Sequence, residues 1–357
     1  MDVNSRLELI KQVGEEIVTE EELKALLESG KQLTAYDGFE PSGVIHVAQA
    51  VMRSINVNRM TKAGVRFKML VADWHAMANN KMGGDLERIQ KVGKYFIEVW
   101  KASGMELDKV EFVWANDLVA DRDYWKRVVQ IGRSATVKRI IRCGQIMGRK
   151  EDDSMTAAQI VYPLMQCADI FHLKADICQL GMDQRKVNML AREIGPELKL
   201  WKPVVVSHHM LMGLTEPPKT EDPLERAMAM KMSKSRPDTA IFMTDSEEEI
   251  NRKLKKAYCP IKQVEENPIM EYCRYLVFGK FNELKIERDP KFGGDLCFGS
   301  YDELAKAYAA EEVHPADLKK AVAGYINGMV EPVRKHFETN QKAKELQEFV
   351  LSQKVTR

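Results

Sequence analysis

The sequence predicts an α/β protein in which a doubly wound parallel sheet is followed by a smaller α-helical domain. Strand-like runs such as residues 32–39 and 66–72 alternate with stretches of helical periodicity. The chain has 357 residues, more than one hydrophobic core usually serves. Between residues 215 and 238 the composition shifts to Pro, Lys, Glu and Ser, so we expect two domains, residues 1–237 and 238–357.

The sequence of the N-terminal part predicts a helix, followed by a strand, a second helix and a second strand. A capping box at Thr19, leucines at helical spacing and a stop at Gly30 indicate that a short amphipathic helix opens the chain. Residues 32–39 are strand-like, a turn and a helical stretch follow, and residues 66–72 are typical of a buried strand. This order implies parallel strands, a right-handed crossover and functional loops at the carboxyl ends of the strands.

The same alternation continues downstream and then gives way to helices. We expect a helix over residues 86–103 and, beyond residue 238, a helix that Ser246 caps and that runs through Lys256. The rest is mainly helical, interrupted by a glycine-rich turn at residues 291–295, without internal repeats. The remaining expected elements are strands at residues 109–114, 175–179 and 203–207 and a helix from Asp183 to Arg192 or beyond.

Charge, cysteine usage and hydropathy narrow the class of protein. Lys and Arg total 54 against 53 Asp and Glu, so the whole molecule has no basic field and any polyanion must be met by a local patch. The six cysteines include no CxxC pair, which suggests neither a zinc site nor a disulfide framework, and we assign no protein-bound metal. The N-terminus lacks the apolar core of a signal peptide, and no segment has the roughly 20 apolar residues of a membrane span. A cytoplasmic protein is the simplest interpretation.

Two motifs indicate residues that could bind phosphate groups. The turn at residues 41–46 places His46 at a helix start, where backbone N–H groups attract anions, although a histidine there is more often a surface or capping residue. Residues 231–235 read KMSKS, and two ammonium groups three residues apart on a polar loop suit a triphosphate. A solvated basic loop is the alternative for such a pentapeptide.

Together the two motifs resemble the signatures of the class I aminoacyl-tRNA synthetases. The resemblance extends over nearly the whole chain and is greatest to the tyrosyl-tRNA synthetases of the archaeal and eukaryotic type. The segments that carry it are residues 36–43, 72–76, 80–85, 162–169, 181–186, 231–235, 256–260, 291–295 and 314–317.

This resemblance implies a fold and a reaction. It implies a Rossmann-like catalytic domain ending at residue 237 with the KMSKS loop, and an α-helical anticodon-binding domain over residues 238–357. The implied enzyme activates L-tyrosine with ATP to tyrosyl-adenylate and pyrophosphate, and then transfers tyrosine to the terminal adenosine of tRNA(Tyr). Mg²⁺ would arrive with ATP as substrate, and a cytoplasmic homodimer is expected.

One signature departs from the family pattern. After His46 the family usually has a glycine and a second histidine, where this chain has Ala48 and Gln49. The methyl group of Ala48 occupies space where adenine approaches the helix. Gln49 can donate a hydrogen bond but carries no charge, so we expect ATP to bind with weaker phosphate stabilisation from this position.

For tyrosine, the resemblance implies that Tyr36 and Asp169 hydrogen-bond the substrate hydroxyl. Without the resemblance, we would expect Tyr36 to be an aromatic residue of the core. Asp169 would be a surface acid on a helix that begins near Tyr162. The resemblance also implies residues that bind the ammonium group and backbone of the tyrosine substrate. The alternative is that these residues are ordinary core or surface residues. These implied positions, with His75 beside the pocket, are Tyr162, Gln166 and Gln184.

For ATP, the resemblance implies Asp183 as the ribose-binding acid, although an aspartate after a glycine is also a common helix cap. The backbone at Met210 and Leu211 would stack on adenine. The catalytic residues it implies are His46, Gln49, Lys231 and Lys234. The full implied ATP set is Gly38, Glu40, His46, Gly181, Asp183, Met210, Leu211, Lys231, Ser233 and Lys234.

For tRNA, the resemblance implies that Phe292 stacks on the first anticodon base and that Asp317 hydrogen-bonds it. A core phenylalanine and a capping aspartate are the alternatives. Arg142 and Lys186 are candidates for contacts with the first pair of the acceptor stem.

Three other functions remain open from the sequence. A tryptophanyl-tRNA synthetase shares the architecture, but indole has no hydroxyl for Tyr36 and Asp169. Another nucleotidylyltransferase of this fold would leave Phe292 and Asp317 without a purpose. A non-enzymatic RNA-binding or signalling paralogue would fit the altered Ala48 and Gln49, although the two KMSKS lysines are intact.

Overall fold

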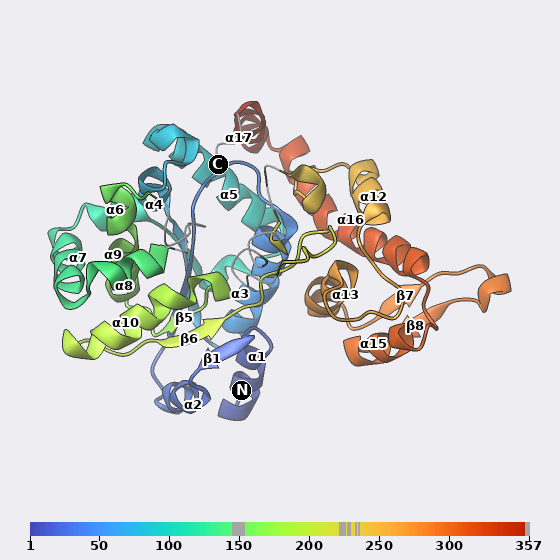
Figure 1. Cartoon of the computed structure of the whole chain (residues 1–357), viewed down its shortest axis with the longest axis horizontal. Coiled ribbons are helices and arrows are strands. Elements are labelled where there is room, and N and C mark those ends of the chain that lie inside the picture. The colour runs from blue at the N-terminus through green and yellow to red at the C-terminus, as the bar shows by residue number, and fades with distance from the viewer. Residues whose placement is uncertain (145–153, 221–225, 227–229, 233, 235, 354–357) are drawn as a thin grey trace.

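A six-stranded sheet forms the centre of the N-terminal part in the computed structural model, which describes residues 1–144, 154–220, 226, 230–232, 234 and 236–353 (Figure 1). The strand order is β1-β6-β5-β2-β3-β4, and only β1 at the edge is antiparallel. The strands are β1 (Glu16–Val18), β2 (Thr34–Phe39), β3 (Arg66–Val71), β4 (Val110–Trp114), β5 (Ile177–Cys178) and β6 (Val204–Ser207).

The strand order indicates where in the sheet a ligand is expected to bind. From β2 the chain builds outward to β3 and β4, and then returns across β2 to add β5 and β6 on its other side. The order therefore reverses between β2 and β5, which pair with Tyr36 opposite Cys178. In sheets of this kind, ligands bind beyond the carboxyl ends of the strands at such a reversal.

Alternating side chains along the strands separate two hydrophobic cores. Ala35 and Phe67 belong to a cluster with helices α1, α2, α3 and α5, whereas Tyr36 and Leu70 belong to one with α7, α9 and α10. Successive strand residues point to opposite faces, so this division follows from the period of two (Figure 1). The helices around the sheet are α1 (Val3–Lys11), α2 (Glu20–Glu28), α3 (Arg53–Lys62), α4 (Asp73–Ala78), α5 (Leu86–Ala102), α6 (Ala115–Val119), α7 (Arg122–Ser134), α8 (Val137–Cys143), α9 (Ala157–His172) and α10 (Arg185–Glu197).

The C-terminal part is mainly helical and packs on the first cluster. Its last helix lies beside α5, where Lys91 Nζ is 4.3 Å from the centre of the Phe349 ring (Figure 1). On the helix before it, His336 Nε2 pairs with Glu98 Oε2 of α5 at 2.7 Å. One hydrophobic cluster therefore includes residues on both sides of residue 237. The domain boundary at residue 237 stays a prediction. The elements are α12 (Glu247–Lys256), α13 (Pro268–Tyr272), α14 (Phe278–Lys280), β7 (Leu284–Ile286), β8 (Leu296–Phe298), α15 (Tyr301–Ala309), α16 (Pro315–Thr339) and α17 (Gln341–Ser352).

The structure corrects several expected elements. The chain opens with α1, whose cap Asp2 accepts from Ser5 N, and not with the helix capped by Thr19. Helix α9 begins at Ala157, five residues before Tyr162, because Thr156 and Gln159 form a capping box. The edge strand β1 and the antiparallel hairpin β7–β8 were not predicted, since three-residue strands are too short to show alternation.

Within the described residues, no helix combines the length and the apolar character that a membrane crossing requires.

Candidate active site

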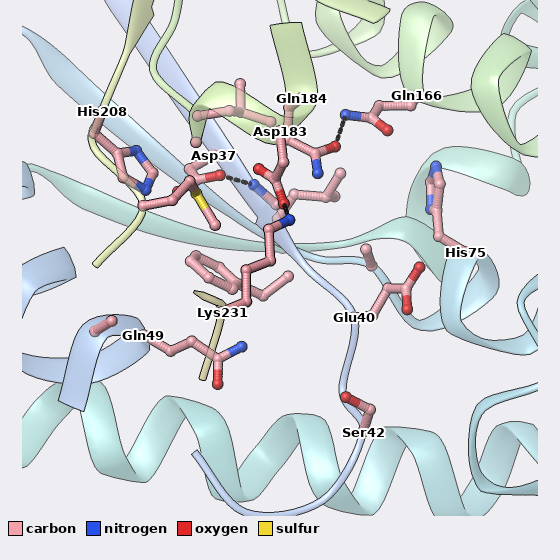
Figure 2. A pocket seen from close by; sticks show the side chains of 18 of the residues that line it. Asp37, Glu40, Ser42, Gln49, His75, Gln166, Asp183, Gln184, His208 and Lys231 are labelled. Atoms are coloured by element: carbon pink, nitrogen blue, oxygen red, sulfur yellow. Dashed lines mark hydrogen bonds and ion pairs between the residues drawn. The ribbon is translucent and has the colours of Figure 1, made fainter. Parts of the chain in front are cut away.

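A cavity of about 350 Å³ opens at the carboxyl ends of the central strands, where the strand order reverses. Its walls come from β2, the turn after β2, α9, the segment around Asp183 and the loop after β6 (Figure 2). The structure brings together most of the residues that the sequence indicated. Those that line the cavity are Tyr36, Gly38, Glu40, His46, Gln49, His75, Tyr162, Gln166, Asp169, Gly181, Asp183, Gln184, Met210, Leu211 and Lys231.

One end of the cavity is closed by buried polar groups. Asp169 is fully buried, with Oδ2 at 3.0 Å from His75 Nε2 and Oδ1 accepting from Tyr124 OH at 2.8 Å. The hydroxyl of Tyr36, which is 1% exposed, has no hydrogen-bond partner among the described residues. A buried phenol without a partner beside a carboxylate is suited to a ligand hydroxyl.

Burial and Asp169 set the protonation of this end. Burial, reinforced by Cys178 and Asp169, raises the pKa of Tyr36 well above its ordinary value, so its hydroxyl keeps its proton. Burial lowers the pKa of His75, but Asp169, together with Glu40 and Asp73, raises it, and the net shift is upward. The His75 ring beside Asp169 therefore accepts a proton more readily than a free imidazole does.

Further along α9, amide groups line the same wall. Gln166 Nε2 donates to Gln184 Oε1 at 3.0 Å, across from α9 to the turn before α10 (Figure 2). Gln166 Oε1 is buried and has no partner among the described residues. Tyr162 meets the His75 ring edge-on, with ring centres 5.0 Å apart. Tyr162, Gln166 and Asp169 thus share one helical face, as their spacing predicted.

At the other end, the turn with His46 is fastened to the chain after the KMSKS loop. Val47 N donates to Ile241 O at 2.9 Å and Met243 N to Ile45 O at 3.0 Å. The helix then begins with a π-helical turn, η1 (Ala48–Met52), a form often found at functional sites. Burial and Lys234 lower the pKa of His46 to about 3, so its ring is neutral at physiological pH.

Gln49 projects into the cavity from this turn (Figure 2). Its backbone carbonyl accepts from Trp100 Nε1 at 2.8 Å, which ties the turn to α5. Its side-chain oxygen Oε1 is buried and has no partner among the described residues. The weaker phosphate stabilisation expected of Gln49 stays a prediction.

Both lysines of the KMSKS motif reach this end. Lys231 Nζ pairs with Asp183 Oδ2 at 2.9 Å (Figure 2), and Lys234 Nζ donates to Ser42 O and Oγ, each at 3.1 Å. Burial and the nearby Lys81 lower the pKa of Lys234 to about 7, against the opposing effect of Glu40. Ser233 lies outside the described residues.

Gly181 lies where the backbone approaches the cavity wall closely. A Cβ at this position would be 2.5 Å from Met210 Sδ and 2.6 Å from Asp183 Oδ1. A larger residue would therefore displace Asp183 and the loop after β6, which explains why glycine stands here.

A buried network behind the cavity was missed by sequence reasoning. Arg53 is 1% exposed, with Nε at 3.1 Å from Asp37 Oδ2, and it also contacts Gln179 and His208. Burial raises the pKa of Asp37 to about 6 although Arg53 opposes the shift. No pattern in the sequence indicates this network, because an arginine on a helix is normally exposed. Tyr124, the donor to Asp169, was also missed, because it reaches Asp169 from a helix 45 positions away in the sequence.

The candidate RNA-binding residues lie away from the cavity. Phe292 is 64% exposed in the turn between β7 and β8, at the end of the molecule opposite α7, and Asp317 lies in the first turn of α16 (Figure 1). Arg142 is exposed on α8, and Lys186 lies on α10, which contacts α8 through Cys143 Sγ and Lys186 O at 3.7 Å. Phe292 is thus not a core residue.

Nothing in the described part of the chain groups three His, Cys, Asp or Glu side chains in a way that could hold a metal ion.

Comparisons with known proteins agree with this geometry. The sequence model described as tRNA synthetases class I (W and Y) matches residues 28–331. The chain is 50% identical over 360 residues to "Tyrosine--tRNA ligase 1, cytoplasmic" of Arabidopsis thaliana, covering 100% of this chain and 90% of the relative.

Solved structures resemble the whole chain. The tyrosyl-tRNA synthetase of Pyrococcus horikoshii, complexed with L-tyrosine, superposes with a TM-score of 0.91 at 39% identity and covers 98% of this chain and 100% of its own. That of Leishmania major, in complex with tyrosinol, gives a TM-score of 0.90 at 44% identity, and this chain spans 53% of its length.

Proposed function

The chain belongs to the class I aminoacyl-tRNA synthetases of the tryptophan and tyrosine group, and from this membership we propose that it is a tyrosine–tRNA ligase. It activates L-tyrosine with ATP to tyrosyl-adenylate and pyrophosphate, and then transfers tyrosine to the 3′-terminal adenosine of tRNA(Tyr). The observation that carries the choice of tyrosine is the unpaired Tyr36 hydroxyl beside the buried Asp169 carboxylate.

These two groups select for a phenol. The substrate hydroxyl donates to Asp169 and accepts from Tyr36, whereas phenylalanine would leave both buried groups without partners. Tyrosyl-tRNA synthetases are themselves the established example of this effect, rejecting phenylalanine by roughly 10⁵ without editing. Indole would also leave one of the two groups unpaired, which disfavours tryptophan.

The rest of the cavity orients the reacting groups. Tyr162, Gln166 and Gln184 hold the ammonium end, and this directs the tyrosine carboxylate toward the α-phosphate of ATP for in-line attack. Catalysis here is positioning and charge stabilisation, without a covalent intermediate on the enzyme.

Lys231 and Lys234 stabilise the pyrophosphate that leaves, and the neutral His46 and Gln49 donate hydrogen bonds to phosphate oxygens. Asp183 holds the ribose, with adenine against the backbone of Met210 and Leu211. Because Asp183 pairs with Lys231 in the free enzyme, ribose binding draws Asp183 away and frees the lysine for the phosphates. Mg²⁺ bound to the phosphates adds charge neutralisation.

The C-terminal part supplies the anticodon contacts of this proposal. The exposed Phe292 offers an aromatic face to an unstacked base, and Asp317 offers an acceptor nearby in the same domain, residues 238–357. Arg142 and Lys186 lie on neighbouring helices of the catalytic domain, residues 1–237, in reach of the acceptor stem.

A homodimer is part of the same proposal. Val129 and Val137 are 62% and 64% exposed on the adjoining helices α7 and α8, and Trp125 is 37% exposed on α7. Trp125 and Val129 are four residues apart and therefore share one face of α7, and exposed apolar side chains of this kind favour a second copy as partner. A cytoplasmic location is supported by the similarity to the cytoplasmic enzyme of Arabidopsis thaliana. Sedimentation equilibrium of the purified chain tests the dimer.

Exchange of labelled pyrophosphate into ATP over a panel of amino acids tests the activity. Tyrosine alone should support exchange, and tyrosine should then be transferred to tRNA(Tyr). Exchange with tryptophan and not with tyrosine, in a folded sample, would overturn the proposal.

A further inference from the structure

His209 joins three segments that are far apart in the sequence. Its Nε2 lies 3.0 Å from Glu271 Oε2 on α13, and its Nδ1 lies 3.3 Å from Glu15 Oε2 just before β1. Its ring stacks on Tyr275, with ring centres 4.4 Å apart and planes inclined by 7°. His209 also lines the cavity, in the loop after β6 that carries Met210.

Glu271 holds the backbone of that same loop. Its Oε2 accepts from Met212 N at 2.8 Å, in addition to its ion pair with His209. The Glu271 side chain is only 17% exposed, so water competes weakly for these two contacts. Burial lowers the pKa of His209, but Glu271 and Glu15 raise it more, so the ring holds a proton more readily than a free imidazole does.

Met212 connects the loop to the KMSKS segment. Met212 and Lys231 form an antiparallel backbone bridge, and Gly213 N donates to Met230 O at 2.7 Å. Glu271 is therefore connected through Met212 to the backbone of Lys231, the lysine that pairs with Asp183. Glu271 is not among the described residues that line the cavity, so any effect on the nucleotide passes through Met212 and His209.

We propose that Glu271 is a positioning residue for ATP: from the C-terminal part of the chain it holds the loop of Met210 and, through Met212, the backbone at Lys231. The proposal rests on the proposed function, because it assigns this loop and this lysine to the nucleotide. It predicts a selective effect, since the tyrosine end is built from β2, α4 and α9, which Glu271 does not contact in the hydrogen bonds described.

Two substitutions of Glu271 test this role. Glu271→Leu removes both contacts and should raise the KM for ATP about tenfold, whereas Glu271→Gln keeps an acceptor for Met212 N and should raise it only about threefold. The KM for tyrosine should stay within about twofold in both variants. Glu271→Gln is nearly isosteric and keeps the test valid if Glu271→Leu does not fold.

Glu98→Gln is the matched control. Glu98 likewise forms a carboxylate–histidine pair between the two parts of the chain, with His336 at 2.7 Å, and its side chain is 20% exposed against 17% for Glu271. An equal rise in the KM for ATP in Glu98→Gln would show a general loosening between the two parts and would overturn the proposal. An unchanged KM for ATP in Glu271→Leu, or an equal rise for tyrosine, would overturn it as well.

Calorimetric titration with ATP separates this proposal from the proposed function. A wild-type protein that binds ATP without pyrophosphate exchange would contradict the function, while the Kd for ATP in the Glu271 variants would still decide the role of Glu271. A wild-type protein that does not bind ATP would contradict both.

Discussion

The two ends of the cavity are built from different kinds of structure. At the end proposed to bind tyrosine, the tyrosine end, Tyr36, His75 and Asp169 come from regular elements, and each is at most 1% exposed. At the end proposed to bind the phosphates, the phosphate end, Lys231 and Lys234 come from a loop and are partly exposed, held by Asp183 and Ser42.

This difference suits the two ends to different tasks, the selection of the substrate and the stabilisation of charge during the reaction. Under the proposed function, buried polar groups cannot turn to water for another partner, so the tyrosine end would reject a substrate that lacks one hydroxyl. Loop lysines held by polar contacts can exchange these partners for phosphate oxygens as charge develops during the reaction. Substitutions at one end should therefore leave substrate binding at the other end nearly unchanged.

The largest effect is expected from the loop lysines. Lys231→Ala and Lys234→Ala should each lower the rate of tyrosyl-adenylate formation about 10²- to 10³-fold, because each removes a cation that stabilises the leaving pyrophosphate. Single-turnover measurements give this rate, and equilibrium binding should show a Kd for tyrosine within about twofold. Unchanged rates would remove both lysines from the mechanism.

A smaller effect, at the opposite end, is expected from the buried carboxylate. Asp169→Asn should lower kcat/KM for tyrosine about 10- to 100-fold, because the substrate hydroxyl loses a charged acceptor, and should leave the KM for ATP nearly unchanged. Asp176→Asn is the control, since Asp176 is also buried but pairs with Lys31 away from the cavity. A similar loss in both variants would point to stability and not to recognition.

A modest effect at the tyrosine end should follow from the residue behind Asp169. Tyr124→Phe removes the donor to Asp169 Oδ1 and should lower kcat/KM for tyrosine about five- to tenfold. Discrimination against phenylalanine should fall with it, measured as the ratio of the two kcat/KM values. A variant with unaltered discrimination would show that Tyr124 does not orient the carboxylate.

The smallest effect is expected from pH at the phosphate end. The pKa of Lys234 is lowered to about 7, so its protonated fraction in the free enzyme falls about tenfold between pH 6 and pH 8. The KM for ATP should rise about threefold over this interval, because the charge that attracts phosphate is lost as the pH rises. Lys234→Arg keeps its charge and should flatten this rise. An identical pH profile in that variant would assign the titration to another group.

Most of the fold could be predicted from local patterns. The runs at residues 32–39 and 66–72 became β2 and β3, and Ser246 caps α12 as expected. Period and capping act between residues a few positions apart, so they are visible in one sequence. The strands β1, β7 and β8 are too short to carry a period, and pairing with a distant segment stabilises each of them.

The candidate site was predicted in its residues and not in its contacts. The KMSKS motif indicated two lysines near phosphate, but not that Lys231 pairs with Asp183, 48 positions away in the sequence. The exposed position of Phe292 also required the structure, since a phenylalanine in a glycine-rich turn is compatible with a core.

The sequence by itself determined the parallel sheet, most of its strands and the family to which the chain belongs, because all three depend on local periods and collinear motifs. Only the tertiary structure decided which polar groups meet. Tyr124 reaches Asp169 across 45 positions and Arg53 reaches Gln179 across 126. Such contacts depend on strand order and on the packing of helices from distant segments, and a local pattern contains neither.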